Sequence, residues 1–175
     1  MTRWTCFFGT LVAIMSTACN KPQELVGFLL YAFATDRRLG TEVASSCRFQ
    51  FAVAVEGEMP GAWIGPPMRG SVLFQRTVNG PNWSVEQRAQ PSIDSVRLEK
   101  EDNDLLLVLH GEFTDTLRGH FDERLGDFRG EWECRPTHPL ANSVRLVEAG
   151  QDSTRAINGS WQLQPRYRRV PPRGG

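Results

Sequence analysis

The sequence lacks an excess of charge of either sign and lacks the short motifs of common enzymes. Its 175 residues include 20 basic and 20 acidic side chains, so the formal net charge is zero. A general nucleic-acid binder normally carries a basic surface, and this balance argues against that class. The chain has no Gly-x-Ser-x-Gly, no His-Glu-x-x-His, no P-loop and no dinucleotide-binding glycine fingerprint. We therefore expect a protein that is not an enzyme and uses no cofactor.

Cysteine is also scarce, with four residues in the whole chain. Cys6 and Cys19 lie in or beside an apolar N-terminal stretch, which leaves Cys47 and Cys134 for the folded domain. Two cysteines are too few for a structural zinc site, and there is no Cys-x-x-Cys pair. Both fall in phase with apolar residues on predicted strands, so we expect a disulfide between them in an oxidising compartment.

The N-terminus has the layout of an export signal. A positively charged start is followed by an almost wholly apolar stretch from Trp4 to Met15, and small residues precede Cys19. The apolar stretch is too short to span a bilayer core of roughly 30 Å comfortably. We therefore expect residues 1–18 to be removed as a signal peptide and residues 19–24 to form a short tether.

Ser16-Thr17-Ala18-Cys19 resembles the lipobox of bacterial lipoproteins. In that family the cysteine becomes the lipidated N-terminus after cleavage, which implies membrane anchoring through Cys19. Ala18 and Cys19 match the family pattern, whereas Ser16 stands where leucine is usual. Ordinary signal-peptidase cleavage after Ala18 is the alternative, because Ser16 and Ala18 also satisfy a small-x-small rule. The resemblance implies a protein on the periplasmic side of the inner or outer membrane, or at the cell surface.

Most of the remaining chain alternates apolar and polar residues with a period of two, which indicates β-strands. The clearest stretch, Leu105 to Cys134, predicts three consecutive strands that each carry Gly-x-aromatic, and the motif returns at residues 159–161. Inward glycines permit sharp coiling and leave room for an aromatic ring. We expect the glycines to face inward and the rings to form one layer: Gly119, Gly130 and Gly159, with Phe121, Trp132 and Trp161.

Three other segments have less regular patterns. Leu25 to Thr35 is apolar on both parities, which fits a strand or a short core helix, and Gly27 favours the strand. Residues 56–70 are rich in proline and glycine and predict a long loop, in which Trp63 covers a core edge or acts as a lid. The arginine-rich tail, residues 165–175, is predicted to be disordered. Val144 to Glu148 is predicted to be a short strand.

About eight to ten short strands without a convincing amphipathic helix predict an all-β antiparallel meander over residues 25–164. We expect a closed or nearly closed up-and-down barrel, with a β-sandwich as the alternative. The repeated Gly-x-aromatic strands, with Gly-x-Trp on the terminal strand, resemble the calycin barrels, the lipocalin and avidin relatives. Leu25-Val26-Gly27 is placed like a lipocalin opening strand, although Leu29 stands where tryptophan is expected. The resemblance implies a barrel whose mouth binds a small apolar ligand.

Two functions remain open from the sequence. A wide cavity would indicate a carrier of a small apolar ligand, whereas packed rings would indicate a structural or interaction module that contacts another envelope protein. Barrels of about eight strands are usually filled by their own side chains, which favours the second function. The candidate ligand contacts are aromatic residues: Phe49, Phe51, Trp63, Phe121, Trp132 and Trp161.

A set of charged residues shares the parity opposite the aromatic residues. His120 and Asp122 lie on one predicted strand, Glu131 and Glu133 on the next, with His110 and Glu112 beside them. Such a set could converge on a metal ion. Interspersed arginines instead favour cross-strand ion pairs on a solvated face, so we expect no metal site.

Overall fold

The computed structural model describes residues 23–37, 42–55 and 61–169, and the predicted signal peptide and Cys19 lie outside them. The described chain forms ten strands and one helix, α2 (Val144–Glu148). The strands are β1 (Gln23–Arg37), β2 (Ala44–Ala54), β3 (Ala62–Gly65), β4 (Leu73–Asn79), β5 (Ser84–Ala89), β6 (Ile93–Glu101), β7 (Asp104–Gly111), β8 (Asp115–Asp122), β9 (Asp127–Cys134) and β10 (Ile157–Arg169). The all-β prediction is confirmed.

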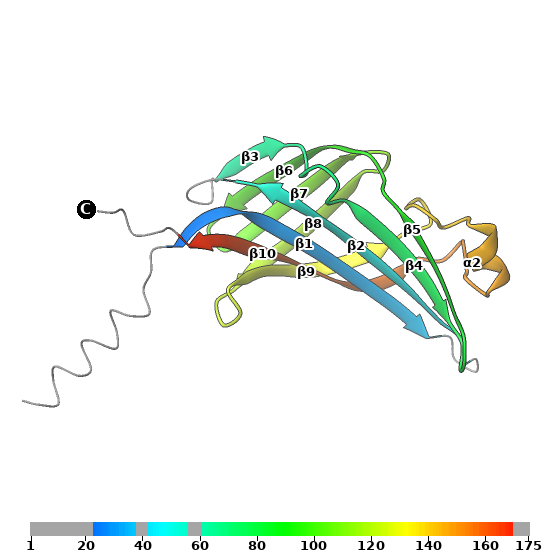
Figure 1. The fold of residues 1–175 in the computed structure, drawn as a ribbon. Helices are drawn as coiled ribbons and strands as arrows, with labels where there is room; N and C mark the ends of the chain where they lie inside the picture. Colours follow the sequence, from blue (N-terminus) through cyan, green and yellow to red (C-terminus); the bar gives the residue numbers. More distant parts are fainter. Residues whose placement is uncertain (1–22, 38–41, 56–60, 170–175) are drawn as a thin grey trace, which may run out of the picture.

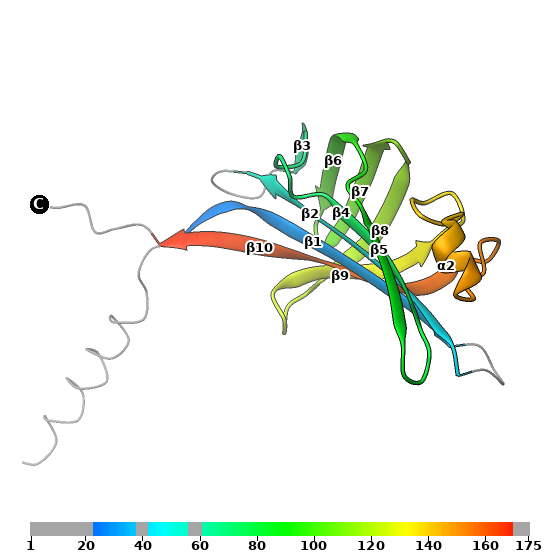
Figure 2. The ribbon, with the colours of Figure 1, turned by 45° about the vertical axis from the view of Figure 1, so that its right-hand side comes forward.

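All ten strands join one antiparallel sheet in the order β3-β6-β7-β8-β9-β10-β1-β2-β4-β5. The sheet curls into a half-barrel, which Figures 1 and 2 show from two directions. The first and last strands, β1 and β10, pair with each other near the middle of the sheet. The predicted meander is therefore confirmed, and a sandwich is excluded for the described strands because it needs two packed sheets.

The two ends of the half-barrel differ. At one end β1 begins and β10 finishes, so both termini of the sheet lie together (Figure 1). At the opposite end the chain between β9 and β10 forms α2 and the loops around it. β3 is an edge strand of the sheet and pairs with β6. The hydroxyl of Ser71, before β4, donates to the carbonyl of Ala52 on β2 and accepts from its N–H.

Paired glycines allow the sheet to coil tightly around a tryptophan. Gly119 on β8 lies opposite Gly130 on β9. A Cβ atom at Gly119 would lie 2.2 Å from the carbonyl oxygen of Arg129 and 2.5 Å from Cζ2 of Trp161. A Cβ atom at Gly130 would lie 2.6 Å from Nε1 of Trp161. The indole of Trp161 therefore covers both glycines, and their predicted inward orientation is confirmed.

The aromatic rings of the Gly-x-aromatic strands do not form the single layer that the sequence predicted. Phe121 pairs with Phe128 at one level, with ring centroids 5.1 Å apart. Trp161 lies at the level of Gly130, and Trp132 lies one inward position further along β9. Successive inward residues of a strand are about 7 Å apart, so the rings occupy three levels along the half-barrel.

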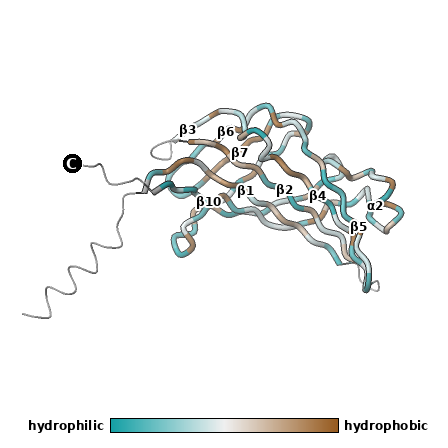
Figure 3. Tube along the Cα trace, viewed as in Figure 1, coloured by the Kyte–Doolittle hydropathy of each residue, from teal (hydrophilic) through white to brown (hydrophobic). Residues whose placement is uncertain are grey.

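Apolar side chains fill the concave face of the sheet, and the alternation along the strands is visible in Figure 3. Leu30, Leu98, Leu107, Leu109 and Leu163 are among its fully buried residues. Charged side chains occupy the opposite, convex face. The interior is thus a continuous hydrophobic core, as the period-two pattern predicted.

Two predicted local structures are wrong. Residues 144–148 form α2 rather than a strand: the N–H of Val147 donates to the carbonyl of Ser143 at 2.9 Å, so its bonds are local, and only Leu146 is buried. Part of the predicted loop 56–70 is the edge strand β3, which needs only one hydrogen-bonded neighbour. Trp63 on β3 is partly buried against the core, as the core-edge alternative predicted.

The predicted domain limits are too narrow at both ends. Gln23 and Glu24, assigned to the tether, belong to β1, and Pro165 to Arg169, assigned to the disordered tail, belong to β10. These segments pair with each other, and Arg168 contacts Glu24 at 2.9 Å. Proline is tolerated at 165 because β10 pairs with β9 only as far as Leu163, which leaves one side of the strand free.

Candidate functional site

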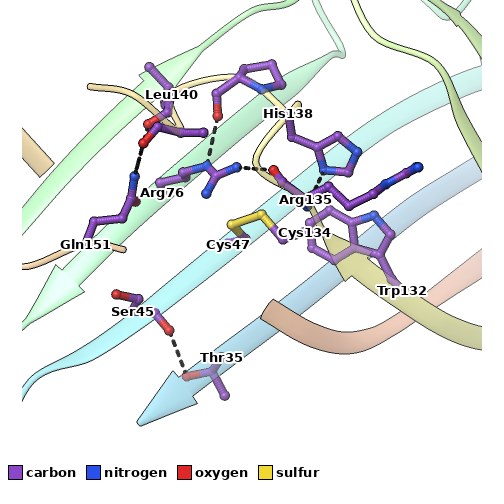
Figure 4. The surroundings of a disulfide bond; sticks show 12 residues. Thr35, Ser45, Cys47, Arg76, Trp132, Cys134, Arg135, His138, Leu140 and Gln151 are labelled. Atoms are coloured by element: carbon purple, nitrogen blue, oxygen red, sulfur yellow. Dashed lines mark hydrogen bonds between the residues drawn. A yellow bond between two sulfur atoms is a disulfide. The ribbon is translucent and has the colours of Figure 1, made fainter. Parts of the chain in front are cut away.

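A disulfide joins two strands that are not neighbours in the sheet. Cys47 on β2 is bonded to Cys134 on β9, as the sequence predicted, and β10 and β1 lie between these strands. A flat sheet would hold strands at this separation about 14 Å apart. The two Cα atoms are only 6.3 Å apart, so the bond spans the concave side of a strongly curled sheet (Figure 4).

A buried arginine lies next to this disulfide (Figure 4). Arg76 projects inward from β4, between the inward Phe74 and Val78, and is 1% exposed. Its Nε donates to the carbonyl of Pro139 at 2.9 Å, and its Nη2 donates to the carbonyl of Arg135 at 2.8 Å. Burial lowers the pKa of Arg76 to about 10, so the side chain stays cationic at neutral pH.

Residues 135–151, which we call the cap, close this end of the half-barrel. Besides the two carbonyls bound by Arg76, the amide of Gln151 donates to the carbonyls of Leu140 and Ala141 at 3.2 and 2.7 Å. Leu146 of α2 is buried. The cap has little regular structure, and these buried side chains satisfy backbone groups that a sheet would otherwise pair.

A buried carboxylate connects the sheet to the cap. Asp115, at the start of β8, is 4% exposed and accepts a hydrogen bond from Nε1 of Trp132 at 3.1 Å. It also accepts one from the backbone N–H of Thr116 at 2.9 Å and forms an ion pair with Arg135. Because each carboxylate oxygen has a donor, the burial of this charge is compensated.

His138 of the cap is buried against the same group. Its Nδ1 accepts a hydrogen bond from the N–H of Arg135 at 3.2 Å, and its Nε2 lies 3.6 Å from a carboxylate oxygen of Asp115. The ring stacks on Trp132 with centroids 6.0 Å apart. Burial lowers the pKa of His138 to about 4; Arg135 and Arg76 act in the same direction, whereas Asp115 opposes them. The imidazole is therefore neutral at pH 7, with its proton on Nε2.

The chemistry of this buried group is structural. Apart from Nε2 of His138, which is buried and has no hydrogen-bond partner, its donors and acceptors bind the backbone or one another. No hydroxyl or thiol nucleophile lies within it among the described contacts. An open hollow beside it is lined by exposed side chains that include Thr114, Thr116 and Glu131. In the described part of the chain, no group of three or more His, Cys, Asp or Glu side chains could hold a metal ion.

The candidate ligand contacts fall into two groups. Phe49, Phe51, Trp132 and Trp161 are buried at 3% exposure or less, whereas Trp63 and Phe121 are only partly buried against the core. The buried rings contact other rings: Phe49 lies 5.5 Å from Phe51 and 5.8 Å from Phe74, and Trp132 lies 6.4 Å from Phe74. The Trp161 indole instead packs on glycines, and its buried Nε1 has no hydrogen-bond partner.

The charged set predicted to lie on a solvated face does so. His110 and His120 are exposed, as are Glu112, Glu131 and Glu133. Asp122 turns into the β8–β9 connection, where it accepts hydrogen bonds from the backbone N–H groups of Arg124 and Leu125 at 3.0 and 3.3 Å. The sheet is therefore oriented as predicted, with the aromatic residues inside and this set outside.

The residues of the buried polar group were missed by the sequence analysis. A signal was present for Arg76, which shares the parity of Phe74 and Val78, and for Asp115, which shares the parity of Phe113 and Leu117. A charged residue at an inward position indicates a buried ion pair or a polar network. No such signal marks the cap residues His138 and Gln151, because the cap has no periodic pattern.

None of the helices in the described ranges is long and apolar enough to cross a membrane. Comparison of the chain with protein-family models, with curated proteins and with solved structures finds no match.

Proposed function

We propose that the protein is an exported, lipid-anchored envelope protein that acts as a non-enzymatic structural or interaction module. The observation that carries the structural or interaction role is the filled interior. The rings of Phe49, Phe74 and Phe113 lie 5.4 to 6.0 Å apart from centroid to centroid, and Trp132 continues the cluster to the cap. A module with such a core acts through its convex face, its edges or its loops.

The disulfide supports export. A bond between Cys47 and Cys134 persists in an oxidising compartment and is rare in a reducing cytosol. The N-terminal apolar stretch and the small residues before Cys19 support the same location, and Cys19 stands only four residues before the start of β1 at Gln23. A lipid on Cys19 would therefore hold the end of the half-barrel that carries both strand termini close to the membrane.

A calycin-type carrier is the second candidate. It would use Trp63 and Phe121, whose rings are only partly buried at the concave face. Native mass spectrometry of protein purified from its host distinguishes the two functions. A retained apolar ligand of defined mass would indicate the carrier, whereas the bare mass of the lipidated chain is the result that we expect.

Lipidation is tested by the variant Cys19→Ala. We expect this variant to leave the membrane fraction and appear in the soluble envelope fraction, because it cannot carry the acyl chains. Cys6→Ala is the matched control and should stay with the membrane, since Cys6 lies in the removed signal. Unchanged membrane partitioning of Cys19→Ala, or an unmodified Cys19 in the mass spectrum of the mature protein, would contradict the proposal.

A further inference from the structure

The sheet has an unpaired edge at β5. This strand is hydrogen-bonded to β4 and is the last in the sheet order, so no second strand pairs with it in the described part of the chain. Its outward side chains, Ser84, Glu86 and Arg88, are exposed. An open strand edge is a template for pairing with another strand.

The other end of the sheet is a poorer template. β3 has only four residues, Ala62 to Gly65, and none of them is charged. β5 has six residues and carries both an acid and a base on one face. A partner strand would therefore find a longer ladder and a specific charge pattern only at β5.

The register between β4 and β5 shows which backbone groups of β5 point away from β4. The N–H of Gly80 donates to the carbonyl of Trp83 at 2.9 Å, and the pairing continues without a bulge through Val78–Val85 and Arg76–Gln87. Hydrogen-bonded pairs alternate with non-hydrogen-bonded pairs in an antiparallel ladder. The N–H and C=O groups of Val85 and Gln87 thus point to β4, and those of Glu86 and Arg88 point to the open edge.

The charges on this open edge are self-complementary. In an antiparallel pairing of two β5 strands about a two-fold axis at Gln87, Glu86 of each copy lies opposite Arg88 of the other. Opposite charges at such directly facing positions stabilise a strand pair, and like charges destabilise it. The neighbouring two-fold registers would set Glu86 against Glu86 or Arg88 against Arg88. The axis at Gln87 also makes Glu86 and Arg88 the hydrogen-bonded positions, which agrees with the direction of their backbone groups.

We infer that two copies of this chain associate through β5, in an antiparallel, two-fold pairing centred on Gln87. The cap contacts the inward face of β5, where the hydroxyl of Ser143 donates to the side chain of Gln87, while the outward side chains Glu86 and Arg88 are exposed. In the single copy Glu86 bonds to Arg88 of its own strand at 2.5 Å and to Gln75 at 2.8 Å. In the pair of copies, Arg88 leaves Glu86 of its own strand and contacts Glu86 of the second copy instead.

Charge reversal tests the register. Two differently tagged copies of the full chain are produced together in the host, and capture of one tag measures how much of the other copy is bound. We expect wild-type copies to be captured together. Glu86→Arg with itself, or Arg88→Glu with itself, should bind at least roughly tenfold less, because two facing pairs become like-charged. Glu86→Arg with Arg88→Glu should restore binding, since every facing pair is then opposite in charge.

The restored mixed pair also shows that each variant folds, because a misfolded copy could not be rescued. Glu99→Arg on β6 is the control: Glu99 contacts Arg97 two residues away, as Glu86 contacts Arg88, but β6 is paired on both sides. Its capture should equal that of the wild type. No capture between wild-type copies, equal self-capture by Glu86→Arg, or no recovery in the mixed pair would overturn the inference.

A single cysteine tests the two-fold axis independently of charge. Facing residues of a non-hydrogen-bonded pair have Cα atoms about 4.5 Å apart, which is within the range of a disulfide. Gln87→Cys should therefore form a disulfide-linked dimer on mild oxidation, whereas Glu86→Cys, which faces position 88 of the other copy, should not. A disulfide-linked dimer of Glu86→Cys, without one of Gln87→Cys, would exclude this axis. The inference does not depend on the anchor at Cys19, so either proposal can fail without the other.

Discussion

The individual residues that stand out are polar ones held in an apolar interior. Asp115 and Arg76 are charged and almost fully buried, and His138 of the cap is buried next to Asp115. Buried polar groups are costly when unpaired. Arg76 donates to two backbone carbonyls, and Asp115 accepts from Trp132, Thr116 and Arg135, whereas Nε2 of His138 has no hydrogen-bond partner. The stability of the capped end therefore depends on whether His138, whose pKa burial lowers to about 4, stays neutral.

Acid should destabilise the protein through His138. The folded pKa is about 4, and the unfolded value is near 6.5. Between these values the unfolded chain binds more protons than the folded chain. The contribution of neutral His138 to the free energy of unfolding is therefore fully present above pH 6.5 and is lost as the pH falls toward 4. The full loss is about 3 kcal/mol. Denaturant melts at a series of pH values measure this loss of unfolding free energy. The comparison changes only His138 and keeps its neighbours Arg76, Arg135 and Asp115.

The change from wild type to His138→Gln isolates this contribution, since the carboxylates titrate in both proteins. The variant should show a flatter fall in stability between pH 6.5 and 4. His120→Gln, at an exposed position, is the control and should keep the wild-type profile. If His138→Gln and His120→Gln have the same pH dependence, His138 is not buried in a neutral form.

Among the elements, the cap behaves differently from the strands. Strands of the sheet satisfy each other's backbone groups, but the cap contains a helix of only five residues and depends on side chains from elsewhere. Arg76 supplies two donors to the carbonyls of Arg135 and Pro139. The guanidinium group of Arg76 thus joins the hairpin of β4 and β5 to the cap, alongside the hydrogen bond from Ser143 to Gln87.

Removing this group should open the cap. Arg76→Met keeps the bulk of the side chain but leaves two buried carbonyls without donors, and we expect a loss of about 2 to 4 kcal/mol. Denaturant melts measure the loss, and amide hydrogen exchange should show that residues 135–151 lose protection first. Arg97→Met, at an exposed position on β6, should stay within about 0.5 kcal/mol of wild type. Equal effects of the two variants would refute the role assigned to Arg76.

At the scale of the whole molecule, one covalent bond and one tryptophan hold a curled, open sheet. The Cys47–Cys134 bond closes a segment with a sequence separation of 87 and pulls β2 and β9 together across β1 and β10. Small residues make this approach possible: Ala34 lies opposite both Cys47 and Gly159 in the sheet. A half-barrel without edge-to-edge closure relies on such a link more than a closed barrel does.

Loss of the disulfide should therefore cost much of the stability. Chain entropy alone assigns about 4 to 5 kcal/mol to a loop of this length. The double variant Cys47→Ala with Cys134→Ala should lose this amount in denaturant melts, and wild-type protein under reducing conditions should match it. Non-reducing peptide mapping of host-purified protein should find the two cysteines linked. Free thiols at both positions, or a loss below about 1 kcal/mol, would contradict this account.

The sequence alone determined which residues face inward on most strands, and therefore the disulfide. A strand's side chains alternate strictly, so the phase of Cys47 with Phe49 and of Cys134 with Trp132 is a local property. The inward orientation of the glycines in the Gly-x-aromatic strands could be predicted for the same reason. Inward orientation at Gly119 and Gly130 requires only the alternation that the printed sequence already contains.

The tertiary structure decided what lies opposite each inward residue and where the sheet ends. The carbonyl partners of Arg76 are 59 and 63 residues away in sequence, so no local pattern indicates that this arginine is satisfied inside the core. Residues 144–148 form a helix with local hydrogen bonds instead of joining the sheet. The unpaired edge at β5 follows from the sheet order, in which the first and last strands meet in the middle. Periodicity reports the face on which a side chain lies, whereas its partner depends on how distant strands pack.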